Sequence, residues 1–190
     1  MGLEIYRKGE DDLVKGCRGR NSSAQRKLYD LYSPKMYALC HRYVRNPAEA
    51  EDILVTAFMK VFEKIDQFKG EGSFEGWIRK IVVNEALTAL RKNRNMALET
   101  DIEAADWDPH SLQFIDHLQV QDLIEMIAEL PPGYRVVFNM YAIDGYSHKE
   151  IADQLGISEN TSKSQLSRAR AYLRKLLDDY DLQAVKTREQ

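Results

Sequence analysis

The sequence predicts an all-α protein with two small helical domains joined by a flexible linker, the second domain containing a helix-turn-helix. Three observations support this fold class. Apolar residues recur mostly at helical spacing, and no convincing alternating run predicts a strand. The stretch 96–118 lacks clear periodicity and divides the chain. Near the C-terminus, two helical segments flank a short turn that contains a glycine.

Length and composition limit the class of protein. The 190 residues suffice for one large domain or two small ones. No run approaches the roughly 18 apolar residues that a membrane span needs, so we do not expect a membrane-embedded protein. The start is polar, with Glu4, Arg7 and Lys8, and does not read as a secretory signal. Cys17 and Cys40 give no disulfide framework. We therefore expect a cytoplasmic protein.

Charge is segregated along the chain, which the formal net charge of −3 conceals. Residues 47–75 contain seven acidic and three basic side chains, whereas residues 158–175 contain five basic and one acidic. An acidic segment and a basic segment indicate two different partners, one of them a polyanion.

The first half of the chain predicts four helices. Apolar stripes place the first two at 10–18 and 24–45. Asn46-Pro47 then breaks the pattern and begins a helix over 48–66, because proline suits a first helical turn. Residues 69–73 read as a loop, and Ser73 is a plausible N-cap for a helix that ends near Arg94.

In the second half, helical spacing resumes over 118–129 and continues over 134–143 after a Pro-Pro-Gly interruption. Two more helices are expected at 148–155 and 159–178. Ser147 and Glu150 have the spacing of a capping box, Gly156 suits a left-handed helix end, and Ser158 suits the cap of the next helix. Together these features predict the helix-turn-helix.

The second helix of this motif carries short polar and long basic side chains opposite its apolar stripe. Those expected to face outward are Lys163, Ser164, Gln165, Ser167 and Arg168. Such groups suit phosphates and base edges in the major groove. A solvated helix of an ordinary bundle would also carry charge, but the capped tight turn favours DNA binding.

The chain resembles the extracytoplasmic-function (ECF) class of bacterial sigma factors over roughly 10–95 and 119–178. The resemblance rests on the order and spacing of several short motifs. They are Ala48-Glu49-Ala50-Glu51-Asp52-Ile53-Leu54, Phe58, Val61-Phe62, Phe74-Glu-Gly-Trp77-Ile78, Ile81-Val82-Val83-Asn84, Leu130-Pro131, Tyr134-Arg135 and the helix-turn-helix that ends in Ser167-Arg168-Ala169-Arg170.

The resemblance implies three regions: sigma domain 2 at 10–95, a linker at 96–118 that would thread toward the RNA exit region, and sigma domain 4 at 119–180. The acidic helix would dock on the clamp helices of core RNA polymerase. The residues implied in this contact are Glu49, Asp52, Thr56, Met59 and Glu63. The family usually has Gln and Glu where this chain has Val55 and Thr56.

Domain 2 would also melt and capture the minus-ten promoter element. The residues implied are Lys69, Phe74, Trp77, Lys80, Asn84 and Arg91. Aromatic and basic groups together suit unpaired bases, which stack and require neutralised phosphates. Within this set, we expect Phe74 and the loop before it to touch DNA, and Trp77 to pack against the acidic helix.

Domain 4 would read the minus-thirty-five element. The residues implied are His148, Lys149, Lys163, Ser164, Gln165, Ser167, Arg168 and Arg170. In this region Ser162 stands where most of the family has Val. The resemblance further implies core RNA polymerase, promoter DNA and an anti-sigma factor as partners.

No catalytic constellation, phosphate-binding glycine loop or metal-ligand spacing is readable, so we expect no enzyme activity, no cofactor and no small-molecule substrate. Two rival interpretations remain. One is a stand-alone helix-turn-helix regulator with a helical effector or dimerisation domain. The other is an anti-sigma or adaptor protein that makes only protein contacts, which the basic second helix of the motif disfavours.

Overall fold

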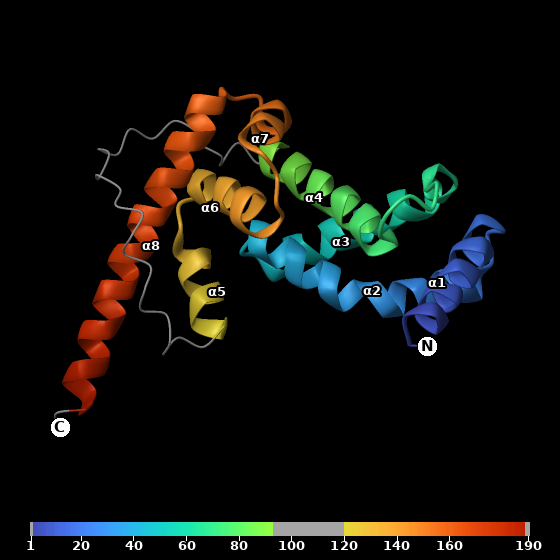
Figure 1. Ribbon diagram of the computed structural model, residues 1–190, viewed down its shortest axis with the longest axis horizontal. Coiled ribbons are helices and arrows are strands. Elements are labelled where there is room, and N and C mark those ends of the chain that lie inside the picture. The colour runs from blue at the N-terminus through green and yellow to red at the C-terminus, as the bar shows by residue number, and fades with distance from the viewer. Residues whose placement is uncertain (1, 93–119, 189–190) are drawn as a thin grey trace. The chain divides into compact units, whose positions relative to one another are not determined.

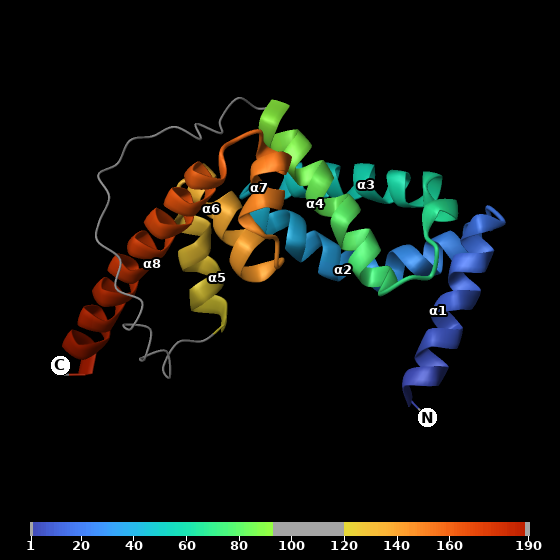
Figure 2. The ribbon, with the colours of Figure 1, turned by 45° about the horizontal axis from the view of Figure 1, so that its top comes forward.

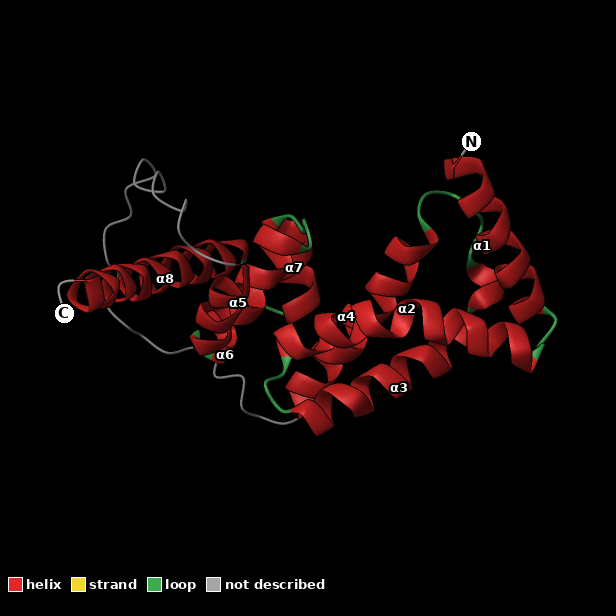
Figure 3. Cartoon of the chain, turned by 90° about the horizontal axis from the view of Figure 1, so that it is seen from below, coloured by secondary structure: helices red, strands yellow, loops and turns green. Residues whose placement is uncertain are grey.

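The computed structural model describes residues 2–92 and 120–188. This part of the chain consists of helices and connecting loops, as Figure 3 shows, and the all-α prediction is confirmed. The chain divides into two compact units, residues 1–92 and 93–190. The predicted linker at 96–118 lies outside the described residues.

The first unit contains α1 (Gly2–Arg18), α2 (Ser22–Tyr43), α3 (Pro47–Glu63), the short 3-10 helix η1 (Ile65–Gln67) and α4 (Phe74–Lys92). Asparagines set two of the helix starts. The side chain of Asn21 accepts a hydrogen bond from the backbone nitrogen of Ala24, at 3.0 Å, and Asn46 accepts one from Ala48, at 2.9 Å. Both therefore satisfy amide groups that a helix start leaves without an intrahelical partner.

Helices α2, α3 and α4 pack on one another, and the three run close together in Figures 1 and 2. The core between them is apolar and includes Tyr32, Met36, Ile53, Ala57, Phe58, Val61, Ile78, Val82 and Leu87, all buried. The expected stripe of α3 therefore faces inward, and the opposite face of this helix is left for solvent or a partner.

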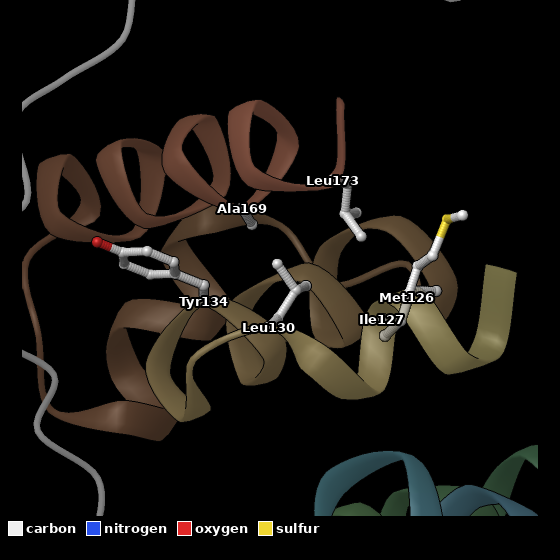
Figure 4. Close-up of a cluster of buried hydrophobic side chains, with 6 residues drawn as sticks. All are labelled: Met126, Ile127, Leu130, Tyr134, Ala169 and Leu173. Atoms are coloured by element: carbon white, nitrogen blue, oxygen red, sulfur yellow. The ribbon is translucent and has the colours of Figure 1, made fainter. Parts of the chain in front are cut away.

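The second unit contains α5 (Val120–Glu129), α6 (Pro132–Phe138), the π-helix η2 (Asn139–Ile143), α7 (His148–Leu155) and α8 (Glu159–Arg188). Its core joins α5, α6 and α8. Figure 4 shows the buried cluster, formed by Met126, Ile127, Leu130, Tyr134, Ala169 and Leu173. One face of α8 thus packs on this unit between Ser162 and Leu177.

Several boundaries differ from the sequence expectation. Helix α1 begins at Gly2 and not at residue 10, and α8 continues to Arg188 and does not end at residue 178. The helix expected at 134–143 begins earlier, because Pro132 occupies its first turn, where a missing backbone N–H leaves nothing unpaired. Its second half is wound as the π-helix η2 instead of a regular α-helix. Among the described residues, no helix combines the length and the low charge that crossing a lipid bilayer requires.

Candidate functional sites

The turn between α7 and α8 is fixed by the groups that the sequence indicated. The Oγ of Ser147 accepts a hydrogen bond from the backbone nitrogen of Glu150, at 3.2 Å, and the Glu150 carboxylate accepts one from the backbone nitrogen of Ser147, at 2.9 Å. Gly156 adopts a left-handed conformation with φ of 69°. The predicted capping box and glycine end of α7 are both confirmed.

The start of α8 is capped in turn by Ser158, whose Oγ accepts a hydrogen bond from the backbone nitrogen of Thr161, at 2.9 Å. Leu166, Ala169 and Leu173 are buried and hold the helix on its unit. Helix α7 packs against α8, and the pair forms the predicted helix-turn-helix, visible in Figure 1.

The side chains predicted to contact the minus-thirty-five element are exposed, half-buried or, for Gln165 alone among them, buried. Lys149, Lys163 and Ser164 are exposed. Those that are half-buried are His148, Ser167, Arg168 and Arg170. The guanidinium carbon of Arg170 lies 5.9 Å from the centroid of the Tyr141 ring, so this cation is held against an aromatic face.

Gln165 does not belong to this surface, because its side chain is only 2% exposed. The expectation that it faces outward was wrong. Gln165 lies three residues after the buried Ser162 and four before the buried Ala169, so helical spacing places it on the packed face. Its polar character suggested an outward position that the geometry of the helix does not allow.

Sequence reasoning missed a hydrogen bond inside the motif. The Oγ of Ser162, a fully buried residue, lies 2.9 Å from Nδ1 of His148. The ring of His148 also stacks on Tyr141, with centroids 4.5 Å apart and planes 22° from parallel. Burial lowers the pKa of His148, Lys163 and then Arg170 lower it further, and Glu159 opposes them.

The exposed face of α3 is partly acidic and partly apolar. Asp52, Thr56 and Glu63 are exposed, and Glu49 is half-buried. Met59 is 67% exposed and Val55, beside it, is 52% exposed. Large apolar side chains that remain accessible between carboxylates are typical of a surface that a protein partner covers.

An ion pair joins α3 to α4, which also pack on each other. The ammonium group of Lys60 lies 2.6 Å from a carboxylate oxygen of Glu85, and the Glu85 side chain is only 12% exposed. Lys35 of α2 similarly contacts Glu75 of α4 at 3.0 Å. The exposed faces of α3 and α4 are therefore held in a defined relation within this unit.

Helix α4 gathers four of the residues named for the minus-ten element on one face. Trp77, Lys80, Asn84 and Arg91 follow one another at intervals of three, four and seven residues, which is the spacing of a single helical stripe. Lys80, Asn84 and Arg91 are exposed and Trp77 is half-buried. The stripe thus combines two cations, an amide and an aromatic edge.

Phe74 is a correction to the sequence expectation, since its side chain is only 1% exposed. Its ring centroid lies 4.9 Å from that of Phe68, 5.7 Å from that of Trp77 and 5.8 Å from that of Tyr32. Phe74 therefore packs in an aromatic cluster and presents no face to DNA. Trp77 packs in the same cluster, with its ring 5.7 Å from Phe68.

The loop between η1 and α4 remains accessible. Lys69 and Glu71 are exposed, and Gly70 and Gly72 adopt φ of 78° and 83°. Side-chain-bearing residues rarely adopt this conformation, so the two glycines allow the sharp path of the loop. Of the loop residues, Lys69 is the one that offers positive charge beside the α4 stripe.

The described residues offer little for chemistry of another kind. Within them, no group of three or more His, Cys, Asp or Glu side chains is placed to hold a metal ion. Cys40 is fully buried, and burial raises the pKa of its thiol to about 12. The thiolate, which is the nucleophilic form, is therefore strongly disfavoured at this position.

Two family comparisons match the two units separately. Residues 28–96 match the family described as Sigma-70 region 2, and residues 120–173 match Sigma-70, region 4. Together these matches span more than half of the chain. The first covers α3 and α4, and the second covers the helix-turn-helix.

Curated relatives match this protein along most of its length. The chain is 29% identical over 178 residues to the ECF RNA polymerase sigma factor SigW of Bacillus subtilis, covering 87% of this chain and 95% of that one. It is 26% identical to the ECF RNA polymerase sigma-E factor of Escherichia coli K12, covering 83% of this chain and 88% of the relative.

A solved structure agrees with these relatives. The sigma factor RpoE of Bartonella quintana, crystallised with the anti-sigma factor NepR, aligns with a TM-score of 0.51 and 25% identity over 80% of this chain and 96% of that one. Since both sigma-70 regions are matched and relatives named as ECF sigma factors align over most of the chain, the chain belongs to the sigma-70 family and to its ECF class of RNA polymerase sigma factors.

Proposed function

We propose a division of labour between the two units of this sigma factor. Sigma factors direct RNA polymerase to promoters, and the described surfaces suggest which residues perform each task here. The observation that carries the proposal is the pairing, in one chain, of a partly apolar acidic helix face with a basic helix-turn-helix. A stand-alone regulator would need the second surface only.

The exposed face of α3 is the docking surface for core RNA polymerase. Met59 and Val55 supply accessible apolar area, and Asp52 and Glu63 supply negative charge beside it. An apolar centre bordered by charge suits a protein partner with a basic, partly apolar surface. The buried core that α3 shares with α4, with the Lys60–Glu85 ion pair at its edge, holds this face in place relative to α4.

The stripe on α4 binds the minus-ten element as single-stranded DNA. Lys80 and Arg91 neutralise phosphates, and Asn84 offers an amide to a base edge. Extracting a base from the duplex costs a few kcal/mol, which the polymerase-bound complex must offset through contacts of this kind. Phe74 has no direct part, because it supports Trp77 from beneath the surface.

The helix-turn-helix reads the minus-thirty-five element in duplex form. Lys149 at the start of α7 and Lys163 on α8 contact phosphates, and Ser164, Ser167 and Arg168 lie further along the face that meets the major groove. The protein acts in the cytoplasm as an initiation factor and is not itself an enzyme.

The proposal also includes an anti-sigma partner. It is supported by the similar RpoE of Bartonella quintana, which was crystallised with the anti-sigma factor NepR. A partner that covers the α3 face or the α8 face would block docking or promoter reading. Promoter-directed transcription should therefore fall when such a protein is added in equimolar amount.

Transcription from purified components tests the main proposal. Sigma-free core polymerase, the full chain and supercoiled genomic fragments should together give new start sites that neither protein gives alone. Sequencing of these starts would define the promoter elements. Tight binding to a duplex palindrome without polymerase, combined with no new transcripts, would contradict the proposal and favour a conventional regulator.

A further inference from the structure

The start of the helix-turn-helix contains a polar contact that the proposed division of labour does not use. Ser162 lies in the first turn of α8, and His148 is the first residue of α7. Their 2.9 Å contact joins the beginnings of the two helices. An apolar side chain would fill the same buried place without a hydroxyl group to satisfy, so packing alone does not account for the serine.

The imidazole is held on a second side by Tyr141, whose ring stacks on it. Tyr141 belongs to the π-helix η2, a conformation that occurs frequently at functional sites. With Nδ1 engaged by Ser162, the other ring nitrogen, Nε2, has no hydrogen-bond partner among the described residues. His148 is half-buried, so the ring retains contact with solvent.

The ring lies in a mainly cationic environment that suits an anion. Lys163, Arg170 and Glu159 of α8 act on the ring electrostatically. Lys149 and Glu150 follow it in α7. In the free protein, burial and the neighbouring cations lower the pKa of His148, so the ring is mainly neutral at neutral pH. A phosphate at the same place would reverse this balance.

We propose that Ser162 is a positioning residue that aims Nε2 of His148 at a phosphate of the upstream promoter element, and that His148 gains a proton when the DNA binds. The inference rests on the proposed function of the second unit. In the imidazolium form both ring nitrogens donate hydrogen bonds. Nδ1 then donates to the Ser162 hydroxyl oxygen and Nε2 to the phosphate, whichever tautomer the neutral ring has.

The consequence is a pH-dependent affinity for promoter DNA. DNA binding raises the pKa of His148, so between the free and bound pKa values the complex holds more protons than the free protein. Affinity therefore rises as pH falls through that window, by up to about tenfold per pH unit for one proton. Above the bound pKa, His148 contributes no pH dependence.

Four forms of the full chain, each assembled with core polymerase, test the proposal: wild type, His148→Gln, Ser162→Val and Ser162→Thr. The probe is a fluorescent duplex that carries the upstream element found in the transcription experiment, and its affinity is measured between about pH 8 and pH 6. His148→Gln lacks the titrating ring and gives the reference pH dependence. Between pH 8 and pH 6, the affinity of wild type and of Ser162→Thr should rise at least about threefold more than the affinity of His148→Gln. Ser162→Val should show no such gain.

A Ser162→Val holoenzyme with the wild-type pH profile would overturn the inference. Failure of wild type to bind the duplex at any pH would instead contradict the proposed function, so the two failures are distinguishable. If Ser162→Val unfolds in thermal melts, Ser162→Ala replaces it. Nitrogen-15 NMR of the imidazole in the full chain gives a second readout, since the duplex should raise the pKa of His148 in wild type, and no rise would also overturn the inference.

Discussion

At the scale of single residues, Gly156 shows how one backbone conformation fixes the helix-turn-helix. Its φ of 69° is left-handed, and a Cβ placed there would meet no other atom within 4 Å. The free-energy cost of adding a side chain here is therefore only that of holding its backbone in the left-handed conformation, roughly 1–2 kcal/mol.

We expect Gly156→Ala to destabilise the second unit by about 1 kcal/mol and Gly156→Asn to cost less, because asparagine tolerates the left-handed region. Hydrogen exchange of the α7 and α8 amides in the full chain would measure both effects. Unchanged protection in Gly156→Ala would show that the turn does not depend on this conformation.

Arg135 is a buried cation that holds two elements together. Its Nη1 donates to the backbone oxygens of Ala128, at 3.0 Å, and Leu130, at 3.4 Å, near the end of α5. Arg135→Met keeps an unbranched side chain but leaves both oxygens without this donor. The second unit should lose about 1–3 kcal/mol of unfolding free energy in denaturant titration. Lys175→Met, at an exposed position of α8, is the matched control and should change stability little.

Gln165 and Phe74 show where residue chemistry misled the sequence interpretation. Both were assigned to a surface because of what their side chains can do, yet both fall on buried helix stripes. Phe74 shares its stripe with Ile78 and Val82, at intervals of four residues. Periodicity therefore contained the correct answer for both. The Ser162–His148 contact was not accessible in this way, because it depends on how α7 packs against α8.

At the scale of elements, capping chemistry made helix starts predictable from sequence. Ser73, Ser147 and Ser158, the caps that the sequence predicted, each accept a hydrogen bond from a backbone amide of the turn that follows. The π-helical turn of η2 was not predictable, because its backbone register depends on tertiary packing around Asn139 and Met140, both fully buried. Such a turn has no local residue signal comparable to a cap.

Helix α3 offers a direct test of the docking face. Asp52→Arg reverses the charge next to Met59 and Val55, whereas Asp12→Arg makes the same change at an exposed position of α1, away from the α3 face. We expect Asp52→Arg to weaken binding to core polymerase about tenfold, because it places like charges opposite a basic partner surface. Asp12→Arg should have a smaller effect. Equal core affinity of the two variants in a titration would remove α3 as the docking element.

At the scale of the whole molecule, charge is segregated by segment and not by unit. The acidic segment 47–75 and the basic segment 158–175 balance each other, whereas the first unit as a whole carries a formal charge of +4 and the second −7, which gives the net charge of −3. A chain of this kind has weak long-range attraction for DNA by itself. Promoter contact should therefore depend on polymerase, which brings both units to the same DNA molecule.

If the units contact DNA independently, the losses from removing one phosphate contact in each should add. Lys80→Ala removes a cation from α4 and Lys163→Ala removes one from α8, in separate compact units. For holoenzyme binding to a promoter fragment, we consider the slope of log affinity against log salt concentration. Each single variant should reduce the magnitude of this slope by about one, and the double variant by about two. The free-energy losses should sum to within about 0.5 kcal/mol, as they do for distant sites.

Lys175→Ala, on the same helix as Lys163 but further from the turn, controls for a general loss of positive charge. A double variant no weaker than Lys163→Ala alone would mean that α4 contacts no DNA phosphate, and the first unit would then contribute to the holoenzyme only through its protein surface.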